Sequence, residues 1–201
     1  MATKRNLGIK DVYYALVTKN TATEYKCETP KKLSRAVKVS VTITKNSENL
    51  YSDSAKEDTI FGEPTIDVEL EIDNLTNEQR ADLYGNTVTD GILVEGADDV
   101  QKDVALMYRN KRGDGKYQFV TLFVGKFGAE DNEELETDED SPKHTTKTLK
   151  GSFRARELDR AVRCIVKEDE LTETEASKAD VKAILENFYS KVPMQTADVE
   201  P

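Results

Sequence analysis

The 201-residue chain has no tryptophan, one histidine, two cysteines and no apolar run long enough to cross a membrane as a helix. His144 has no serine or cysteine in a recognisable partner motif, so the sequence indicates no nucleophilic catalytic site. Cys27 and Cys164 lie far apart and belong to no CxxC or Cys/His cluster, which predicts reduced thiols rather than a disulfide. We therefore expect no enzyme activity, no cofactor, no metal and no membrane span.

Basic residues are also in the minority. The chain has 29 Lys and Arg against 39 Asp and Glu, a net charge of -10. This balance disfavours sequence-independent binding of nucleic acid, because such binding comes from Lys and Arg side chains that neutralise phosphates. The length favours one domain, predicted over residues 1–190, with a frayed tail over 191–201.

The stretch IDVELEIDNL, residues 66–75, alternates apolar and acidic residues with the period of two of a β-strand. Its polar face would carry four carboxylates in a row, those of Asp67, Glu69, Glu71 and Asp73. Same-face neighbours lie about 6.7 Å apart, so each adjacent pair repels by about 0.6 kcal/mol in water. A hydrolase site here is disfavoured, because four equivalent acids do not separate the pKa of an acid from that of a base.

Other segments predict a mainly β (α+β) fold with antiparallel strands. Alternating or apolar runs indicate strands over residues 12–17, 37–44, 92–94, 104–108, 117–124, 148–156 and 161–166. A capping box between Thr76 and Gln79, followed by Gly85, predicts a short helix over residues 77–84. A longer helix flanking the sheet is predicted to begin at Thr172 or Thr174.

Two polar segments interrupt this pattern. Residues 45–62 separate two of the clearest strands, and unstructured insertions of that length in a compact domain are commonly functional, so we predict a contact arm. Its candidate contact residues are Asn49, Leu50, Tyr51, Ile60 and Phe61. Residues 129–142 include eight carboxylates between Glu130 and Asp140 and predict a solvated acidic loop whose role stays open.

A basic face is predicted on the strand that follows the acidic loop. With period two, Lys150, Arg154 and Arg156 share one face. One hypothesis is that this face meets a carboxylate-rich surface of a neighbouring copy, because opposite charges fix the register of an interface. The alternative is that these residues are simply solvated.

The order of these features resembles a known family. The segments that carry the resemblance are GIKDVYYALVT, ENLYSDS, FGEPTIDVELEIDNL and GILVEGADDVQKDVALMYRNKRGDGKYQFVTLFVGKF. Together they resemble the major tail proteins, or tail tube proteins, of phages with long non-contractile tails that infect Gram-positive bacteria. The similarity extends from about Leu7 to Tyr189.

The resemblance implies an antiparallel β-sandwich or barrel-like domain with a flanking helix, six copies closing into a ring, and rings stacking into a tube through which DNA passes. It implies that residues 45–62 reach the neighbouring ring and that the sheet beside them lines the bore. The implied partners are further copies and the tape measure, tail terminator and distal tail proteins, in a virion assembled from protein made in the host cytoplasm.

Physics gives the acidic strand a role in that setting. A basic tube wall would bind DNA by counterion release, whereas an acidic wall repels DNA toward the axis of the tube. We therefore expect the four acids to face the lumen. Two other readings stay open. One is a secretion-system-like tube subunit, and the other is a soluble monomeric carbohydrate- or protein-binding module, for which Tyr13, Tyr14 and Tyr51 would be the exposed aromatics.

Overall fold

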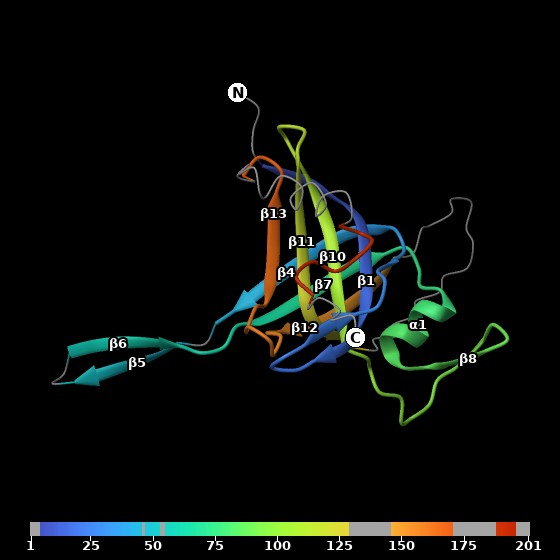
Figure 1. The fold of residues 1–201 in the computed structure, drawn as a ribbon, viewed down its shortest axis with the longest axis horizontal. Coiled ribbons are helices and arrows are strands. Elements are labelled where there is room, and N and C mark those ends of the chain that lie inside the picture. The colour runs from blue at the N-terminus through green and yellow to red at the C-terminus, as the bar shows by residue number, and fades with distance from the viewer. Residues whose placement is uncertain (1–4, 46, 53–54, 129–145, 171–187, 196–201) are drawn as a thin grey trace, which may run out of the picture.

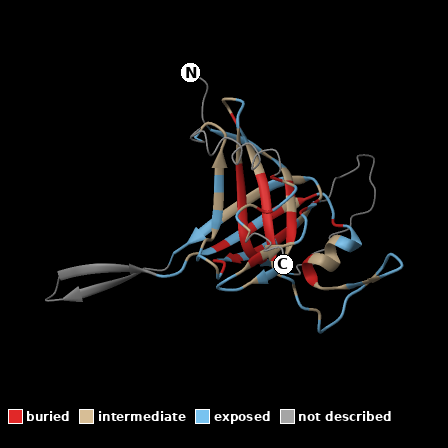
Figure 2. Ribbon diagram, in the orientation of Figure 1, coloured by how far each residue is buried: buried red, intermediate tan, exposed pale blue. Residues whose placement is uncertain are grey.

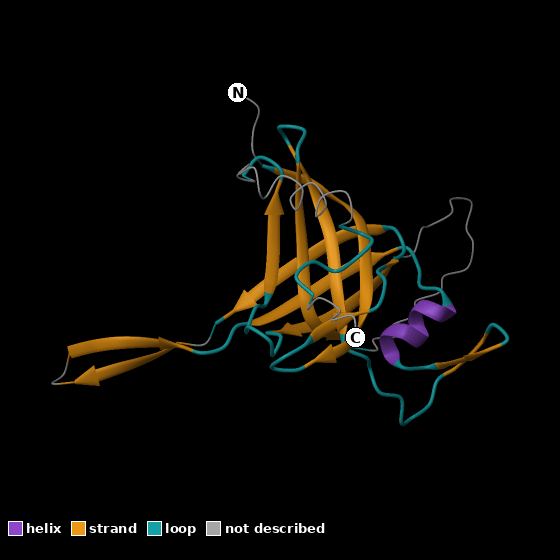
Figure 3. Cartoon of the chain, viewed as in Figure 1, coloured by secondary structure: helices purple, strands orange, loops and turns teal. Residues whose placement is uncertain are grey.

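Strands make up most of the computed structural model, which describes residues 5–45, 47–52, 55–128, 146–170 and 188–195 (Figures 1 and 3). The expectation of a mainly β, antiparallel protein is confirmed. The elements in chain order are β1 Asn6–Asn20, β2 Tyr25–Cys27, β3 Lys31–Lys32, β4 Ala36–Thr44, β5 Ser47–Ser52, β6 Ala55–Phe61, β7 Thr65–Ile72, α1 Asn77–Tyr84, β8 Thr87–Thr89, β9 Ile92–Val94, β10 Val104–Arg112, β11 Tyr117–Phe127, β12 Lys147–Arg154 and β13 Arg163–Lys167.

One large antiparallel sheet dominates, with the strand order β2-β1-β10-β11-β12-β7-β4. Strand β13 pairs with β11 beside β12, and β3 pairs with β1. The β5–β6 and β8–β9 pairs form separate two-stranded sheets. The long β1 contains a register shift where Asp11 adopts a φ of 49°. Such a bulge bends a strand and lets a long one follow a curved sheet.

The sheet curls around a core that contains residues from strands near both ends of the strand order. Val12 and Tyr14 of β1 pack in the same buried cluster as Val68 and Leu70 of β7. Strands β1 and β4 lie at opposite parts of the strand order, yet some of their Cα atoms approach within 8 Å. No ladder joins them within the described residues, so the curl is left open along a seam between β1 and β4.

The other face of β1, β10 and β11 is covered by residues from the end of the chain. Phe188 and Val192 are 2% and 1% exposed and pack with Met107, Phe119 and Phe123. The central strands are therefore buried on both faces, which explains their continuous apolar runs (Figure 2).

The end of the chain corrects one prediction. The amide of Cys27 donates to Oε1 of Gln195 at 2.9 Å, and Val192 is buried. The part of the predicted frayed tail that the structure describes, 191–195, is thus packed against the sheet. The predicted long helix, which begins at Thr172 or Thr174, lies outside the described residues except for Phe188, which is in a turn. The acidic loop at 129–142 also lies outside them.

The short helix is confirmed at its predicted bounds. The Thr76 hydroxyl accepts from the amide of Gln79, and the Gln79 side chain accepts from the amide of Thr76. Gly85 ends the helix with a φ of 80°, and a Cβ there would lie 2.2 Å from the carbonyl oxygen of Val100. Both the left-handed backbone and the close approach require glycine at this position.

Candidate functional site

The predicted contact arm is a β-hairpin. Strands β5 and β6 pair with each other in an antiparallel register that sets Glu48 opposite Ile60 and Leu50 opposite Asp58. The expectation of an unstructured insertion is therefore wrong, since most of the segment forms regular strands. The hairpin leaves the sheet between β4 and β7 and projects from it (Figure 1). It contains all five predicted contact positions, 49, 50, 51, 60 and 61.

The acidic row lies on β7 as the alternation predicted. Ile66, Val68, Leu70 and Ile72 are each at most 1% exposed and belong to the core. On the opposite face Asp67 and Glu69 are exposed and Glu71 is half-buried, while the exposed Asp73 follows the strand. The hydrophobic face fixes the register of the strand, because a slip by one residue would bury the acids.

Lysines flank the acidic row from both neighbouring strands. Lys150 of β12 lies opposite Glu69, and Lys38 of β4 lies opposite Glu71. The Thr146 hydroxyl also donates to Oε1 of Glu71 at 2.7 Å. At a cross-strand separation of about 5 Å, each opposite-charge pair gains about 0.8 kcal/mol in water, which is comparable to the repulsion along the row. The fold therefore offsets much of the repulsion that the sequence predicts, and the face keeps an excess of negative charge.

The predicted basic face is reduced to two residues. Lys150 and Arg154 are exposed on β12, and Arg154 donates two hydrogen bonds to Asp103, at 3.1 and 2.9 Å. Arg156 does not share this face: it is 1% exposed. Strand β12 ends at Arg154, so the alternation that placed Arg156 outward stops before reaching it. The prediction for Arg156 is wrong for that reason.

Arg156 instead organises a buried cluster. Its Nε and Nη2 atoms donate to the two carboxylate oxygens of Asp159 at 2.7 and 2.6 Å. Its Nη1 atom donates to the carbonyl oxygen of Met194 at 2.9 Å. The guanidinium also lies over the rings of Phe123 and Tyr25, 4.1 and 5.0 Å from their centroids. Arg156 thereby fastens the last described segment of the chain to the sheet.

This ion pair changes the titration of its acid. The bidentate hydrogen bonds from Arg156 lower the pKa of Asp159 from 3.8 to about 2, with a further contribution from the Ala161 amide. Sequence reasoning missed this pair. The three-residue spacing of Arg156 and Asp159 was a signal, but only the folded chain shows that two aromatic rings enclose the guanidinium.

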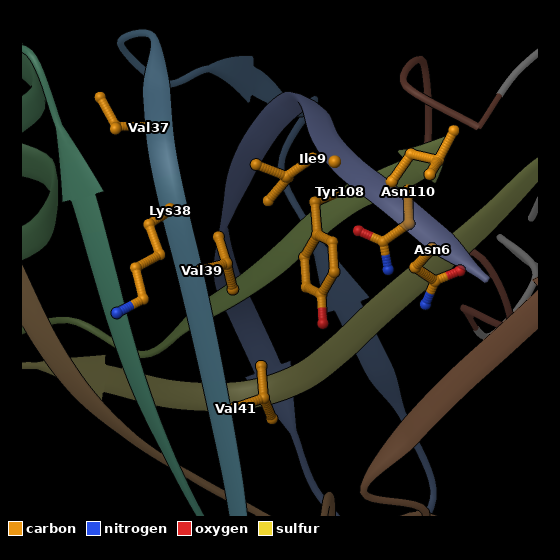
Figure 4. Close-up of a pocket in the computed structure, with 10 residues that line it drawn as sticks. Asn6, Ile9, Val37, Lys38, Val39, Val41, Tyr108 and Asn110 are labelled. Carbon is orange, nitrogen blue, oxygen red and sulfur yellow. The ribbon is translucent and has the colours of Figure 1, made fainter. Parts of the chain in front are cut away.

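A groove runs along the seam between β1 and β4 (Figure 4). It has a volume of about 440 Å³, and β10 contributes part of its lining. Its apolar lining comes from Ile9, Val39, Val41 and Tyr108, with polar groups from Asn6, Lys38 and Asn110. We call it the seam groove. Residues 6–10 of β1 pair only with β10, and β4 pairs only with β7, so each strand presents a second edge without a ladder partner in the described chain.

The seam groove also corrects the reading of β4. The sequence predicts one buried apolar face over Val37, Val39, Val41 and Ile43. Only Val39 and Val41 pack against the core, whereas Val37 and Ile43 are 55% and 39% exposed. Strand β4 lies at the edge of the sheet, and only its middle part packs on the core, so Val37 and Ile43 near its two ends stay exposed.

Two of the aromatic residues considered for a carbohydrate site, Tyr13 and Tyr14, do not form an exposed platform. Tyr14 is 1% exposed, and its hydroxyl donates to Oδ2 of Asp82 at 2.8 Å. Tyr13 stacks on Tyr189 with 4.3 Å between ring centroids. The side chain of Tyr51 lies outside the described residues. Burial and the hydrogen bond to Asp82 raise the pKa of Tyr14 far above its usual value.

The described part of the chain contains no group of three or more His, Cys, Asp and Glu side chains arranged to hold a metal ion. It also contains no helix with the length and apolar character needed to span a membrane. Family models and curated proteins give no match to this chain. The class that the fold itself defines is a mainly β protein built on one curled antiparallel sheet.

Proposed function

We propose that the chain is a structural subunit that closes into six-copy rings, which stack into a phage tail tube. The observation that carries the proposal is the β5–β6 hairpin, which projects from the sheet at the place where the tail tube resemblance puts an inter-ring arm. In this reading the curled sheet is the tail tube fold, a barrel-like sandwich. The tape measure, tail terminator and distal tail proteins are its partners in the virion.

The acidic row has a physical role in such a tube. Duplex DNA carries about one negative charge per 1.7 Å of axis, so a basic wall would hold it through counterion release. The β7 face has four acids against Lys38 and Lys150, since Arg154 is engaged by Asp103. An excess of negative charge on the lumen wall would repel passing DNA toward the axis.

Ring closure needs two different surfaces on each copy, because a ring uses heterologous contacts. Lys150 and Arg154 are exposed on one face of β12, and Arg154 is also paired with Asp103 of the same copy. A carboxylate-rich surface on the next copy is the complementary patch, and the segment 129–142 supplies the densest run of acids in the sequence. This pairing predicts that assembly weakens as salt screens the charges.

Negative-stain electron microscopy of the concentrated purified protein tests the function. Six-fold rings or tubes support it. A monodisperse monomer at every concentration contradicts it and favours a monomeric binding module. A secretion-system-like tube subunit would also form rings. Long tubes that form without a contractile sheath protein distinguish a tail tube from it only if genome ejection also depends on the acids of β7.

A further inference from the structure

We propose that the seam groove binds a long-chain carboxylate, with the hydrocarbon chain along the apolar lining and the carboxylate at the polar groups of β1 and β10. Contacts between copies do not require such a site, so the inference goes beyond the proposed function and does not rest on it. Small-molecule sites are typically apolar clefts in which a few polar groups fix the orientation of the ligand.

The first observation is a buried phenol without a hydrogen-bond partner. Tyr108 of β10 is 7% exposed and lines the groove, and its hydroxyl makes no hydrogen bond within the described residues. Figure 4 shows its side chain facing Val39 and Val41 across the seam. A buried hydroxyl without a partner costs free energy, so this group is expected to bond a molecule that enters the groove. Burial raises the pKa of Tyr108, and the charge of Arg163 opposes that rise only in part, so the hydroxyl stays protonated and can donate.

Two amide side chains extend the polar side of the groove. Asn110 of β10 is half-buried and Asn6 of β1 is exposed, and both line the groove. Neither side chain makes a hydrogen bond in the part of the chain that the structure describes. Figure 4 shows both of them on the same side of the groove as Tyr108. Each can donate through its Nδ2 atom, so three neutral donors are available to one acceptor group.

The charge on this face of the sheet is positive. Tyr108 lies opposite Val120 of β11, which in turn lies opposite Ile165 of β13. Arg163 is two residues before Ile165, so its side chain is on the same face of the sheet as Tyr108. It is exposed and has no ion pair within the described residues. A ligand with a negative charge beside Tyr108 would therefore be attracted by an arginine that no acid already neutralises.

The groove also lacks acidic residues. The strand segments beside it, residues 6–10, 36–41 and 108–111, contain none. Lys38 contributes to the lining, but its side chain points toward the other face of β4 (Figure 4). A carboxylate can accept from several N–H and O–H groups at once, whereas a cation would meet no acid. The polar side of the groove therefore favours an anion.

The rest of the lining is aliphatic. Ile9, Val39 and Val41 pack beside the groove, and Leu7 and Val37, which also line it, are 67% and 55% exposed. These exposed groups gain from burial against a hydrocarbon chain. A volume of about 440 Å³ holds roughly fifteen non-hydrogen atoms at about 30 Å³ each. This matches a carboxylate of about ten to twelve carbons.

Titration of the full-length protein with decanoate at pH 7, followed by isothermal titration calorimetry, tests the proposal. Binding should saturate at one site per chain. It should be at least tenfold tighter than the binding of hexanoate, because each buried methylene group strengthens binding by about fourfold. Nuclear magnetic resonance of methyl-labelled protein should show shifts at Ile9, Val39 and Val41. Absence of saturable binding, or shifts confined to other methyl groups, would overturn the inference.

Two variants test the polar side of the groove. Tyr108→Phe removes only the hydroxyl and should weaken decanoate binding by about tenfold. Its matched control is Tyr117→Phe, on the other face of the sheet, which should bind like the wild type. Arg163→Gln should weaken decanoate binding by about threefold and leave the binding of 1-decanol unaltered, because only the carboxylate is charged. Arg154→Gln on β12 makes the same change of net charge and is the control for Arg163→Gln.

The variants also define how the inference can fail. Circular dichroism and thermal melting confirm that each variant is folded. Decanoate binding that either Tyr108→Phe or Arg163→Gln leaves unchanged would overturn the inference, as would an equal effect of Arg163→Gln on 1-decanol. These measurements do not depend on whether the protein forms rings, so the inference and the proposed function can fail separately.

Discussion

At the scale of single residues, Arg156 shows how burial changes the role of a charged side chain. It holds Asp159 through two hydrogen bonds, holds the carbonyl of Met194 and lies over Phe123 and Tyr25. Arg154, two residues earlier, makes a similar two-bond contact with Asp103, but its side chain is 50% exposed. Substituting each arginine therefore compares the same two-bond contact with an aspartate at a buried and at an exposed position.

Arg156→Met should lower the free energy of unfolding by about 2–4 kcal/mol, because it removes the donor to the Met194 carbonyl and both guanidinium hydrogen bonds of Asp159. Arg154→Met should cost less than about 1 kcal/mol, since solvent replaces an exposed ion pair. Urea denaturation followed by circular dichroism measures both. Equal losses for the two variants would contradict the structural role assigned to Arg156.

Acid should weaken the same contact. The folded chain lowers the pKa of Asp159 from 3.8 to about 2, so the pair stabilises the fold above about pH 4 and loses that contribution as the pH falls through about 2. Asp159→Asn should therefore be less stable than the wild type at pH 6, and the difference should shrink toward pH 2. Urea denaturation of both proteins across this pH range measures the difference. A difference that stays constant with pH contradicts the assignment.

At the scale of elements, the contact of β11 with β12 depends on a glycine. A Cβ on Gly125 would lie 2.3 Å from the ring of Phe153, which packs directly over this position. Gly128 follows β11, and a Cβ on Gly128 would lie 3.7 Å from the carbonyl oxygen of Lys150, an ordinary van der Waals distance. The ring of Phe153 also meets Phe127 edge to face, 5.7 Å between centroids, so it has little room to move.

Gly125→Ala should destabilise the fold by about 1–3 kcal/mol, because the added methyl group overpacks the core against Phe153. Gly128→Ala is the matched control and should change the stability by no more than about 0.5 kcal/mol. Thermal and urea denaturation measure both variants. If Gly125→Ala were neutral, the position of the Phe153 ring would have to differ from the one described.

At the scale of the whole molecule, the sheet presents three different outer surfaces. Residues 188–195 cover the face of β1, β10 and β11. The face of β12, β7 and β4 is polar and carries the acidic row with its flanking lysines. The seam between β1 and β4 carries a groove, and the projecting hairpin pairs with no other strand within the described residues.

Reversing part of the acidic row should slow DNA transit. Glu69→Lys with Glu71→Lys changes the charge of the β7 face by four units and turns it basic, which favours DNA retention through counterion release. Genome ejection from particles with variant tails should slow, and more so at low salt. Asp98→Lys with Glu157→Lys, at exposed acids off this face, makes the same net change and should leave ejection unaltered. Normal ejection from normally assembled Glu69→Lys/Glu71→Lys tails would contradict a lumen role for the row.

The sequence by itself determined what depends on local periodicity and local hydrogen bonds. The alternation of β7, the apolar runs of β1 and β11, and the cap of α1 by Thr76 and Gly85 could all be read without a structure. Only the tertiary structure decided what depends on long-range neighbours. The strand order brings Lys150 and Lys38 beside the acids, the end of β12 turns Arg156 inward, and the curl of the sheet leaves a groove between β1 and β4. The physical reason is that the period of a strand states which residues share a face, whereas the surroundings of that face come from segments that are distant in the chain.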